Sequence, residues 1–304
     1  MSWARYSTQP RRNIVLRLLI KSMRPKQWTK NVFVWAALVF DRKLFQTQYL
    51  LPTLAGFAIF CLLSSAVYLI NDLVDIEHDR QHPVKRNRPL ASGQLRKSVA
   101  VIAAVLIIVI CVPTAFALNV QFGIISTAYL LLMIAYSFYL KNRVIVDVMT
   151  IAAGFVLRVA GGVVLVDVER FSPWLYICMT LLALFLGFSK RRHELALLAE
   201  GANNHRAILD EYSLRFLDEM INVVASSTVI AYSLYTFFAP NVPANHTMML
   251  TIPFVLYGIF RYLYLIHIRE EGGSPEELLL KDKPFFLNVV LFGIAVIVIM
   301  YFTR

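Results

Sequence analysis

The sequence predicts an all-α, polytopic membrane protein with nine transmembrane helices. Of its 304 residues, 58% are hydrophobic and only 16% are charged, whereas globular domains average about 45–50% apolar and about 25% charged residues. A soluble domain of this length cannot bury so much apolar surface. Apolar runs of about 20 residues, the length that crosses a bilayer as a helix, recur along the whole chain. A soluble enzyme, a disordered chain and a fibrous protein are therefore excluded.

Nine segments are candidate spans, and polar or basic connections separate them. The first is the weakest, because its apolar part from Trp28 to Phe40 is short and Asp41 follows. Residues 1–27 are polar and basic, and no small-residue cleavage site follows a compact apolar run, so we expect a basic N-terminal segment and no signal peptide. The candidates are residues 28–45, 50–70, 98–117, 121–140, 144–166, 173–189, 220–239, 247–267 and 285–302.

The positive charges predict the orientation of these spans. Of the 30 Lys and Arg residues, 24 fall in one set of connections and only 4 in the other. Cytoplasmic loops carry the excess of basic residues, so we expect a multi-pass protein of the cell membrane with a cytoplasmic N-terminus and an outward C-terminus. The inner connections 71–97, 190–219 and 268–283 are long and rich in both signs of charge. The chemistry is therefore expected at the cytoplasmic face of a single domain, residues 1–304.

Three carboxylates and a carboxamide follow the second candidate span. If the helix continues, Asp72, Asp75 and Asp79 lie within about 60° of one another around its axis, with Asn71 beside Asp75. Oxygen ligands suit Mg²⁺, which takes one or two carboxylates and leaves positions for water and substrate phosphates; Mn²⁺ is a candidate substitute. The alternative is a solvated helix end whose acids pair with nearby basic residues. The N-D-x-x-D-x-x-x-D spacing favours the metal site, with these three aspartates as catalytic residues.

A basic loop comes directly after the acidic residues. Lys85, Arg86 and Arg88 lie between Pro83 and Pro89, which predicts an extended or turn segment. A metal site beside Lys and Arg donors is what a polyphosphate ligand needs. The excess of positive charge in cytoplasmic loops would by itself explain basic residues in this loop. It does not explain why they directly follow the three aspartates.

The acidic motif and the K-R-x-R-P-L-A-S-G segment after it resemble the first aspartate-rich motif of the UbiA superfamily of intramembrane prenyltransferases. The resemblance implies a bundle of nine helices with an active cavity open to the cytoplasm. It also implies that Asn71 and the three aspartates hold Mg²⁺ on a diphosphate leaving group.

The second motif of that superfamily is missing. Members that prenylate aromatic acceptors carry D-x-x-x-D after the sixth span, but here residues 187–195 read G-F-S-K-R-R-H-E-L. Lys190 and Glu194 share a helix face at i, i+4, next to Arg191. One interpretation is a topology anchor with a surface ion pair worth a few tenths of a kcal/mol, about 0.3–0.5. The interpretation we favour is a second phosphate site made of protein cations.

In lacking the second motif, the sequence resembles one branch of the superfamily, the decaprenyl-phosphate phosphoribosyltransferases. The segments that carry the resemblance begin at Met23, Tyr139, Arg158, Gly187, Tyr212 and Ser274, and they cover roughly residues 20–285. The branch implies transfer of 5-phosphoribose from phosphoribosyl pyrophosphate (PRPP) to a polyprenyl phosphate, with release of pyrophosphate. These substrates carry more phosphate than a prenyl diphosphate and a carboxylate acceptor, which fits the excess of basic residues.

Further basic residues are candidates for substrate binding. Arg158 lies within the fifth span, where a charge costs several kcal/mol, about 2.5–3.5, unless it is paired or faces a polar cavity; we favour the cavity over an internal ion pair. Lys26 and Lys30 are interfacial anchors or phosphate contacts, and their branch-like motif favours the second. Lys141 is included, although topology alone could explain it. Asp147 is open as an ion-pair partner of Arg158 or a metal neighbour.

The sequence leaves three hypotheses for the function of the protein. The first is Mg²⁺-dependent phosphoribosyl transfer from PRPP to a polyprenyl phosphate. The second is prenyl transfer from a prenyl diphosphate to an aromatic or other small acceptor, and the third is a non-catalytic lipid-binding or transport protein. The expected partners are PRPP, the polyprenyl phosphate and membrane lipids. No nucleic acid is expected, and a homo-oligomer is left open.

Overall fold

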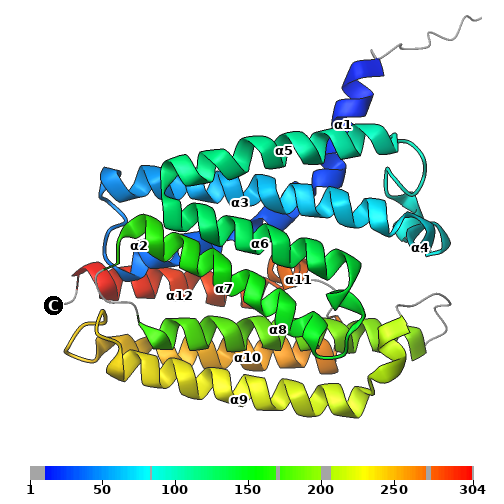
Figure 1. The fold of residues 1–304 in the computed structure, drawn as a ribbon. Coiled ribbons are helices and arrows are strands. Elements are labelled where there is room, and N and C mark those ends of the chain that lie inside the picture. The colour runs from blue at the N-terminus through cyan, green and yellow to red at the C-terminus, as the bar shows by residue number, and fades with distance from the viewer. Residues whose placement is uncertain (1–10, 83, 169–171, 200–206, 272–274, 303–304) are drawn as a thin grey trace, which may run out of the picture.

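The chain forms a bundle of long helices (Figure 1). The computed structural model describes residues 11–82, 84–168, 172–199, 207–271 and 275–302. Within these ranges all regular structure is helical. Eight helical segments there are long and apolar enough to cross a membrane, so the prediction of an all-α, multi-pass membrane protein is confirmed. The eight are α3 (Thr47–Val74), α5 (Lys97–Leu118), α6 (Val120–Phe138), α7 (Val146–Val166), α8 (Pro173–Ala199), α9 (Leu214–Phe238), η5 with α10 (Thr247–Thr251 and Ile252–His267) and α12 (Lys283–Phe302).

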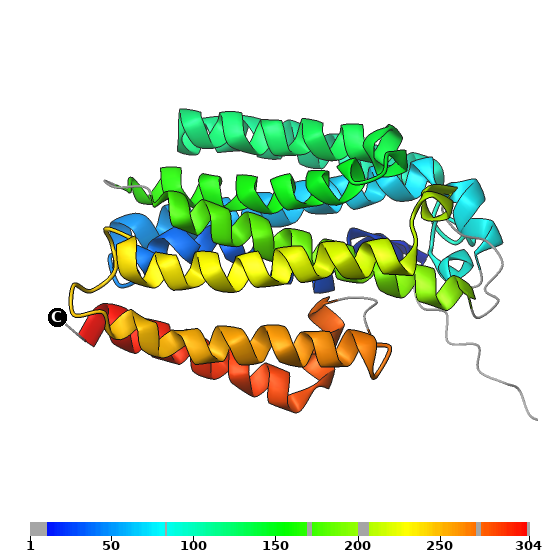
Figure 2. The ribbon, with the colours of Figure 1, turned by 90° about the horizontal axis from the view of Figure 1, so that it is seen from below.

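Shorter elements connect these helices. They are α1 (Arg11–Met23), η1 (Pro25–Trp35), α2 (Ala36–Phe40), α4 (Ile76–Gln81), η2 (Lys85–Asn87), η3 (Leu140–Asn142), η4 (Ala207–Glu211) and α11 (Pro275–Lys281). In both views α4 lies at the end of the bundle opposite the last turn of α12 (Figures 1 and 2). The elements η3 and η4 contact each other.

The two largest apolar cores among the described residues lie in different parts of the bundle. The first lies between α3, α6 and α7, where Phe60, Phe122 and Tyr129 pack edge to face. The second lies between α8, α9 and α10 and includes Phe185 and Leu217, both almost fully buried. Helix α7 contacts α8 and so joins the two cores, while α10 and α12 form a hairpin beside the second core (Figure 2).

The count of nine spans is not confirmed, because the first expected span is not one continuous α-helix. Arg24 has a left-handed backbone with φ of 54°, and the 3₁₀ helix η1 and the short α2 follow it. Arg24 pairs with Asp72 near the end of α3, and Lys43 lies over the Tyr49 ring near the start of α3. The segment therefore runs antiparallel to α3. A 3₁₀ helix rises about 2.0 Å per residue, so η1 and α2 together extend about 30 Å, close to the hydrocarbon thickness of a bilayer.

Helix α8 is longer than predicted. It continues to Ala199, ten residues past the expected end at residue 189. At about 1.5 Å per residue its 27 residues extend about 40 Å. The basic residues that follow the sixth predicted span are therefore helical, and they occupy the last turns of α8.

The close contact between η1 and α7 gives a first prediction. A Cβ atom added to Gly162 would lie 2.0 Å from the Val34 carbonyl oxygen, a backbone atom that cannot rotate away. We expect Gly162→Ala to displace η1 and to lower stability by about 1–3 kcal/mol, the usual cost of overpacking. The matched control is Gly293→Ala in α12, where an added Cβ meets nothing within 4 Å. Thermal unfolding of the purified protein in detergent should be shifted down only by the first change. Equal unfolding temperatures for both variants would contradict this packing.

Candidate active site

The three aspartates lie at the junction of α3 and α4. Helix α3 ends at Val74, and Asp75 is the junction residue, with φ −93° and ψ 9°. Backbone hydrogen bonds from Asp75 N–H to the Asn71 carbonyl (2.9 Å) and from Asp79 N–H to the Asp75 carbonyl (2.8 Å) continue across it. The helical spacing expected for Asp72, Asp75 and Asp79 is thus nearly preserved through the junction. Asp72 and Asp79 are only 2% and 4% exposed.

Each aspartate contacts a protein cation. Arg24 from the start of η1 pairs with Asp72. Arg88 donates from one nitrogen to Asp72 at 3.2 Å and to Asp79 at 2.6 Å. A buried lysine from another connection, Lys141, pairs with Asp75. Charges as buried as these are tolerated only when they are paired, and here the cations come from three separate parts of the chain.

The donor set of this junction suits a hard divalent ion. It offers three carboxylates and, on Asn71, a carboxamide that donates to Asp75 Oδ2 at 3.0 Å. Such oxygen ligands are the kind that Mg²⁺ takes. Within the described ranges, however, no three acidic, histidine or cysteine side chains are close enough to share an ion, since Arg24, Arg88 and Lys141 hold the aspartates. The residues fit Mg²⁺ by their chemistry, and the cations supply the neutralising charge that the ion would bring.

The basic loop turns one of its residues inward and leaves another outside. Arg88 is part-buried against the aspartates, whereas Arg86 is exposed. Lys85 starts the single 3₁₀ turn η2, and His82 Nδ1 accepts the Lys85 N–H at 3.2 Å, so the expected turn segment is present; Pro83 lies outside the described residues.

The charged groups that act on His82 show which part of the structure the loop after α4 faces. Burial lowers the pKa of His82, and Lys85 adds to that effect, while Glu194 on α8 opposes it. The loop after α4 is therefore within electrostatic reach of the end of α8. Lys30 is likewise within reach of Lys190, so η1, the basic loop and α8 surround the same region.

Arg191 is the most buried of the basic residues on α8. It is 2% exposed, and its three nitrogens bind three different groups. Nε donates to Asp147 Oδ2 at 2.6 Å, Nη2 donates to the Tyr136 hydroxyl at 3.3 Å, and Nη1 pairs with Glu194. Asp147 is fully buried and also accepts from the Tyr212 hydroxyl at 2.9 Å. Asp147 therefore pairs with Arg191, and not with Arg158, the ion-pair partner considered for it from the sequence.

The neighbours of Arg191 on α8 behave differently. Lys190 is half-buried, and among the described residues no carboxylate lies within ion-pair distance of its ammonium group. Arg192 turns to the second core and pairs with Asp218 at 2.5 Å. Lys190 thus differs from Arg191 and Arg192, each of which pairs with a carboxylate.

Arg158 lies in a neutral polar cluster deep in the bundle. Its Nε donates to Asn31 Oδ1 at 2.6 Å, its Nη1 to the Gly154 carbonyl at 2.7 Å and its Nη2 to the Tyr129 hydroxyl at 2.8 Å. The guanidinium therefore makes no ion pair within the described part of the chain, and it is not grouped with the aspartates. Asn31 also reaches Cys61 Sγ at 3.2 Å, which ties α7 to η1 and α3.

Sequence reasoning missed several of these partners. Asn31 and Tyr212 belong to segments that carry the branch resemblance, which is the signal that could have found them; Tyr136 has no such signal. The two lysines of η1 differ, since Lys26 is exposed and Lys30 is half-buried.

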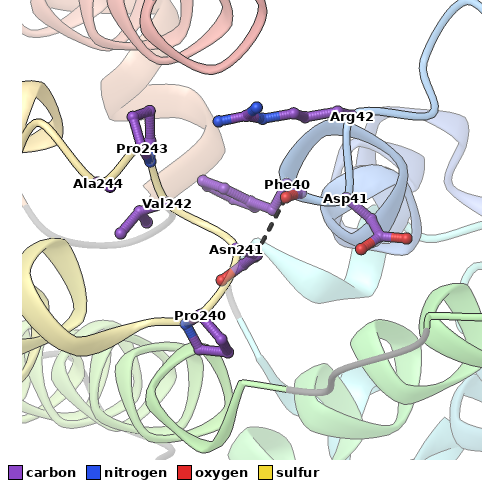
Figure 3. Close-up of a pocket in the computed structure, with 8 residues that line it drawn as sticks. All are labelled: Phe40, Asp41, Arg42, Pro240, Asn241, Val242, Pro243 and Ala244. Atoms are coloured by element: carbon purple, nitrogen blue, oxygen red, sulfur yellow. Dashed lines mark hydrogen bonds between the residues drawn. The ribbon is translucent and has the colours of Figure 1, made fainter. Parts of the chain in front are cut away.

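A pocket of about 360 Å³ lies at the opposite end of the bundle (Figure 3). Its lining comes from the turn after α2 and the connection after α9, and Asn241 bridges the two by donating to the Phe40 carbonyl at 3.1 Å. Arg42 points across its mouth toward Pro243 (Figure 3). The pocket is far from the aspartates and contains none of the predicted site residues.

Comparison with known proteins identifies the family. The UbiA prenyltransferase family matches residues 32–290. The decaprenyl-phosphate phosphoribosyltransferase of Mycobacterium tuberculosis is 31% identical over 283 residues, 91% of each chain. That of Mycolicibacterium smegmatis is 33% identical over 289 residues, 90% of this chain and 89% of the relative. A UbiA homolog from Archaeoglobus fulgidus, solved with GPP and Mg²⁺, superposes with a TM-score of 0.72 at 18% identity, covering 93% of this chain and 99% of the homolog. This chain therefore belongs to the UbiA prenyltransferase family.

Proposed function

We propose that this protein transfers 5-phosphoribose from PRPP to a polyprenyl phosphate and releases pyrophosphate, with Mg²⁺ as cofactor. The observation that carries the proposal is the distribution of charge at the site. One acidic cluster is already surrounded by Arg24, Arg88 and Lys141, and a basic run on α8 stands where the superfamily has its second acidic motif. The names of the two mycobacterial relatives support the same reaction.

The number of phosphates explains why the site needs so many cations. PRPP has a diphosphate and a 5-phosphate, and the acceptor adds a lipid phosphate. Asp72, Asp75 and Asp79, with Asn71, would hold Mg²⁺, which when bound supplies Lewis-acid neutralisation of the leaving diphosphate. Arg88 and Lys141 already contact these aspartates and are placed to donate to the same diphosphate. The other phosphates are left to the residues around them, Lys26, Lys30, Lys85, Arg86, Lys190 and Arg24.

The protein's side chains are needed to orient the substrates and to offset negative charge, not to supply a general base. The bond between ribose C1 and the diphosphate oxygen breaks while an oxygen of the lipid phosphate bonds to C1 from the opposite face. The lipid phosphate is anionic near neutral pH, so the transfer needs no strong general base. The cations orient the two anions and offset the charge that grows on the leaving diphosphate. We place this site at the cytoplasmic face of the cell membrane, since 24 of the 30 basic residues fall on that side.

The direct test uses the purified protein with Mg²⁺, PRPP labelled in the ribose and a polyprenyl phosphate. We expect the label to appear in the lipid fraction and pyrophosphate to be released in equal amount. Incubation with a prenyl diphosphate and an aromatic acid is the parallel reaction, and we expect no product from it. Turnover of the prenyl diphosphate without any transfer from PRPP would overturn the proposal in favour of prenyl transfer.

A further inference from the structure

The backbone at Ile145, between η3 and α7, has an unusual conformation. Its φ is 66° and its ψ is −46°, and the Val146 N–H donates across it to the Val144 carbonyl at 2.7 Å. This is a γ-turn with positive φ, a rare and strained conformation for an L-residue, and a β-branched side chain makes it more so. Such a turn persists only where the surrounding structure holds it.

The hydroxyl of Tyr212 makes the contacts that hold this turn. It accepts the Ile145 N–H at 2.6 Å and donates to Asp147 Oδ1 at 2.9 Å. Burial raises the pKa of Tyr212 to about 12, so the hydroxyl keeps the proton that it donates. Asp147 is itself fixed by Arg191 at 2.6 Å. The turn is thereby tied to the end of α8 and to the start of α9.

The turn fixes the element that carries Lys141. Lys141 lies in η3, four residues before Ile145, and its buried ammonium pairs with Asp75. The Arg143 carbonyl between them accepts the Asp147 N–H at 3.0 Å. A release of the turn at Ile145 is therefore expected to move η3 and to draw Lys141 away from the aspartates.

We propose that Tyr212 is a positioning residue: by holding the γ-turn at Ile145, it keeps Lys141 on the aspartate cluster, where Lys141 binds the diphosphate of the substrate. This assignment rests on the proposed function for the identity of the diphosphate. It also gives Asp147 and Arg191 the role of fixing the Tyr212 hydroxyl.

The test is Tyr212→Phe, which removes only the hydroxyl. We expect kcat/KM for PRPP to fall about 10- to 100-fold, as for a displaced catalytic group. In a Lys141→Met background the same change should cost less than about twofold, because the group that it positions is already gone. Hydrogen exchange of the peptide 140–149 should become faster. The matched control is Tyr301→Phe, whose hydroxyl accepts the Leu44 N–H at 2.9 Å in a part-buried contact remote in sequence from the aspartates; it should leave kcat/KM unchanged.

Two outcomes overturn the assignment. One is a loss of kcat/KM in Tyr212→Phe that adds in full to that of Lys141→Met, which would make Tyr212 structural only. The other is unchanged exchange of the peptide 140–149, which would mean that the hydroxyl does not hold the turn. The exchange experiment needs no substrate, so it tests the turn even where wild-type protein fails to use PRPP, a failure that would count against the proposed function.

Discussion

Replacing Asp72 by Asn should lower kcat by about 1,000-fold, the upper range for losing one charged group that acts on the transition state. Asp72 is almost fully buried and accepts from both Arg24 and Arg88. The amide removes one carboxylate from the ligand set proposed for Mg²⁺, and it leaves two guanidinium groups sharing a neutral partner. Transfer of labelled ribose from PRPP to the lipid fraction measures the effect.

The matched control for Asp72 is Glu77→Gln. Glu77 lies in α4, directly after the junction, but it is exposed and pairs with the exposed Arg80 at 2.9 Å. Exposed pairs of this kind contribute about 0–1 kcal/mol, so its kcat should stay within about twofold of wild type. A transfer rate of Asp72→Asn close to that of Glu77→Gln would remove Asp72 from the catalytic site.

Replacing Arg88 by Met should separate metal binding from turnover. The Arg88 guanidinium lies between Asp72 and Asp79, so it competes with a cation for the same two carboxylates. Without it we expect Mn²⁺, bound in the absence of substrate, to bind about 10-fold more tightly. We expect kcat/KM for PRPP to fall about 10- to 100-fold, because a charged hydrogen bond to phosphate contributes about 1.5–3 kcal/mol.

Electron paramagnetic resonance of Mn²⁺ and the transfer assay measure the two effects of Arg88→Met separately. The control is Arg96→Met, an exposed arginine at the end of the same connection, for which both quantities should match those of wild type. Weaker Mn²⁺ binding in Arg88→Met would contradict the arrangement, since it would mean that the guanidinium supports the ion site instead of competing for it.

The membrane-spanning part of the fold could be predicted because bilayer thickness sets the length of an apolar helix. Helices α3, α5, α6 and α7 begin and end within a few residues of the expected positions. The form of the first segment could not be predicted, since it packs against α7 through the contact between Val34 and Gly162, two residues far apart in the sequence.

The candidate site also has a part that could be predicted from the sequence and a part that could not. Local spacing was enough to predict that Asp72, Asp75 and Asp79 lie close together, since they fall within about two helical turns. Their partners Arg24 and Lys141 come from other elements, 48 and 66 residues away in the sequence. The spacing of Lys190 and Glu194 suggested a pair, but Glu194 pairs with Arg191 at i, i+3. Charge patterns on one helix indicate which residues share a face, but not which of them the neighbouring helices will meet.

The 3₁₀ form of η1 has a consequence for how its sequence can vary. With three residues per turn, side chains at i and i+3 eclipse one another. Lys26, Thr29 and Val32 accordingly form an exposed row, while Asn31 and Val34 form a buried one. A residue inserted or deleted before Asn31 would rotate everything beyond it by about 120°. Each side chain would then move to the next of the three rows, which takes Asn31 from Arg158. The length of this segment is thus constrained more tightly than the composition of its outer row, where Thr29 and Val32 face away from the buried partners.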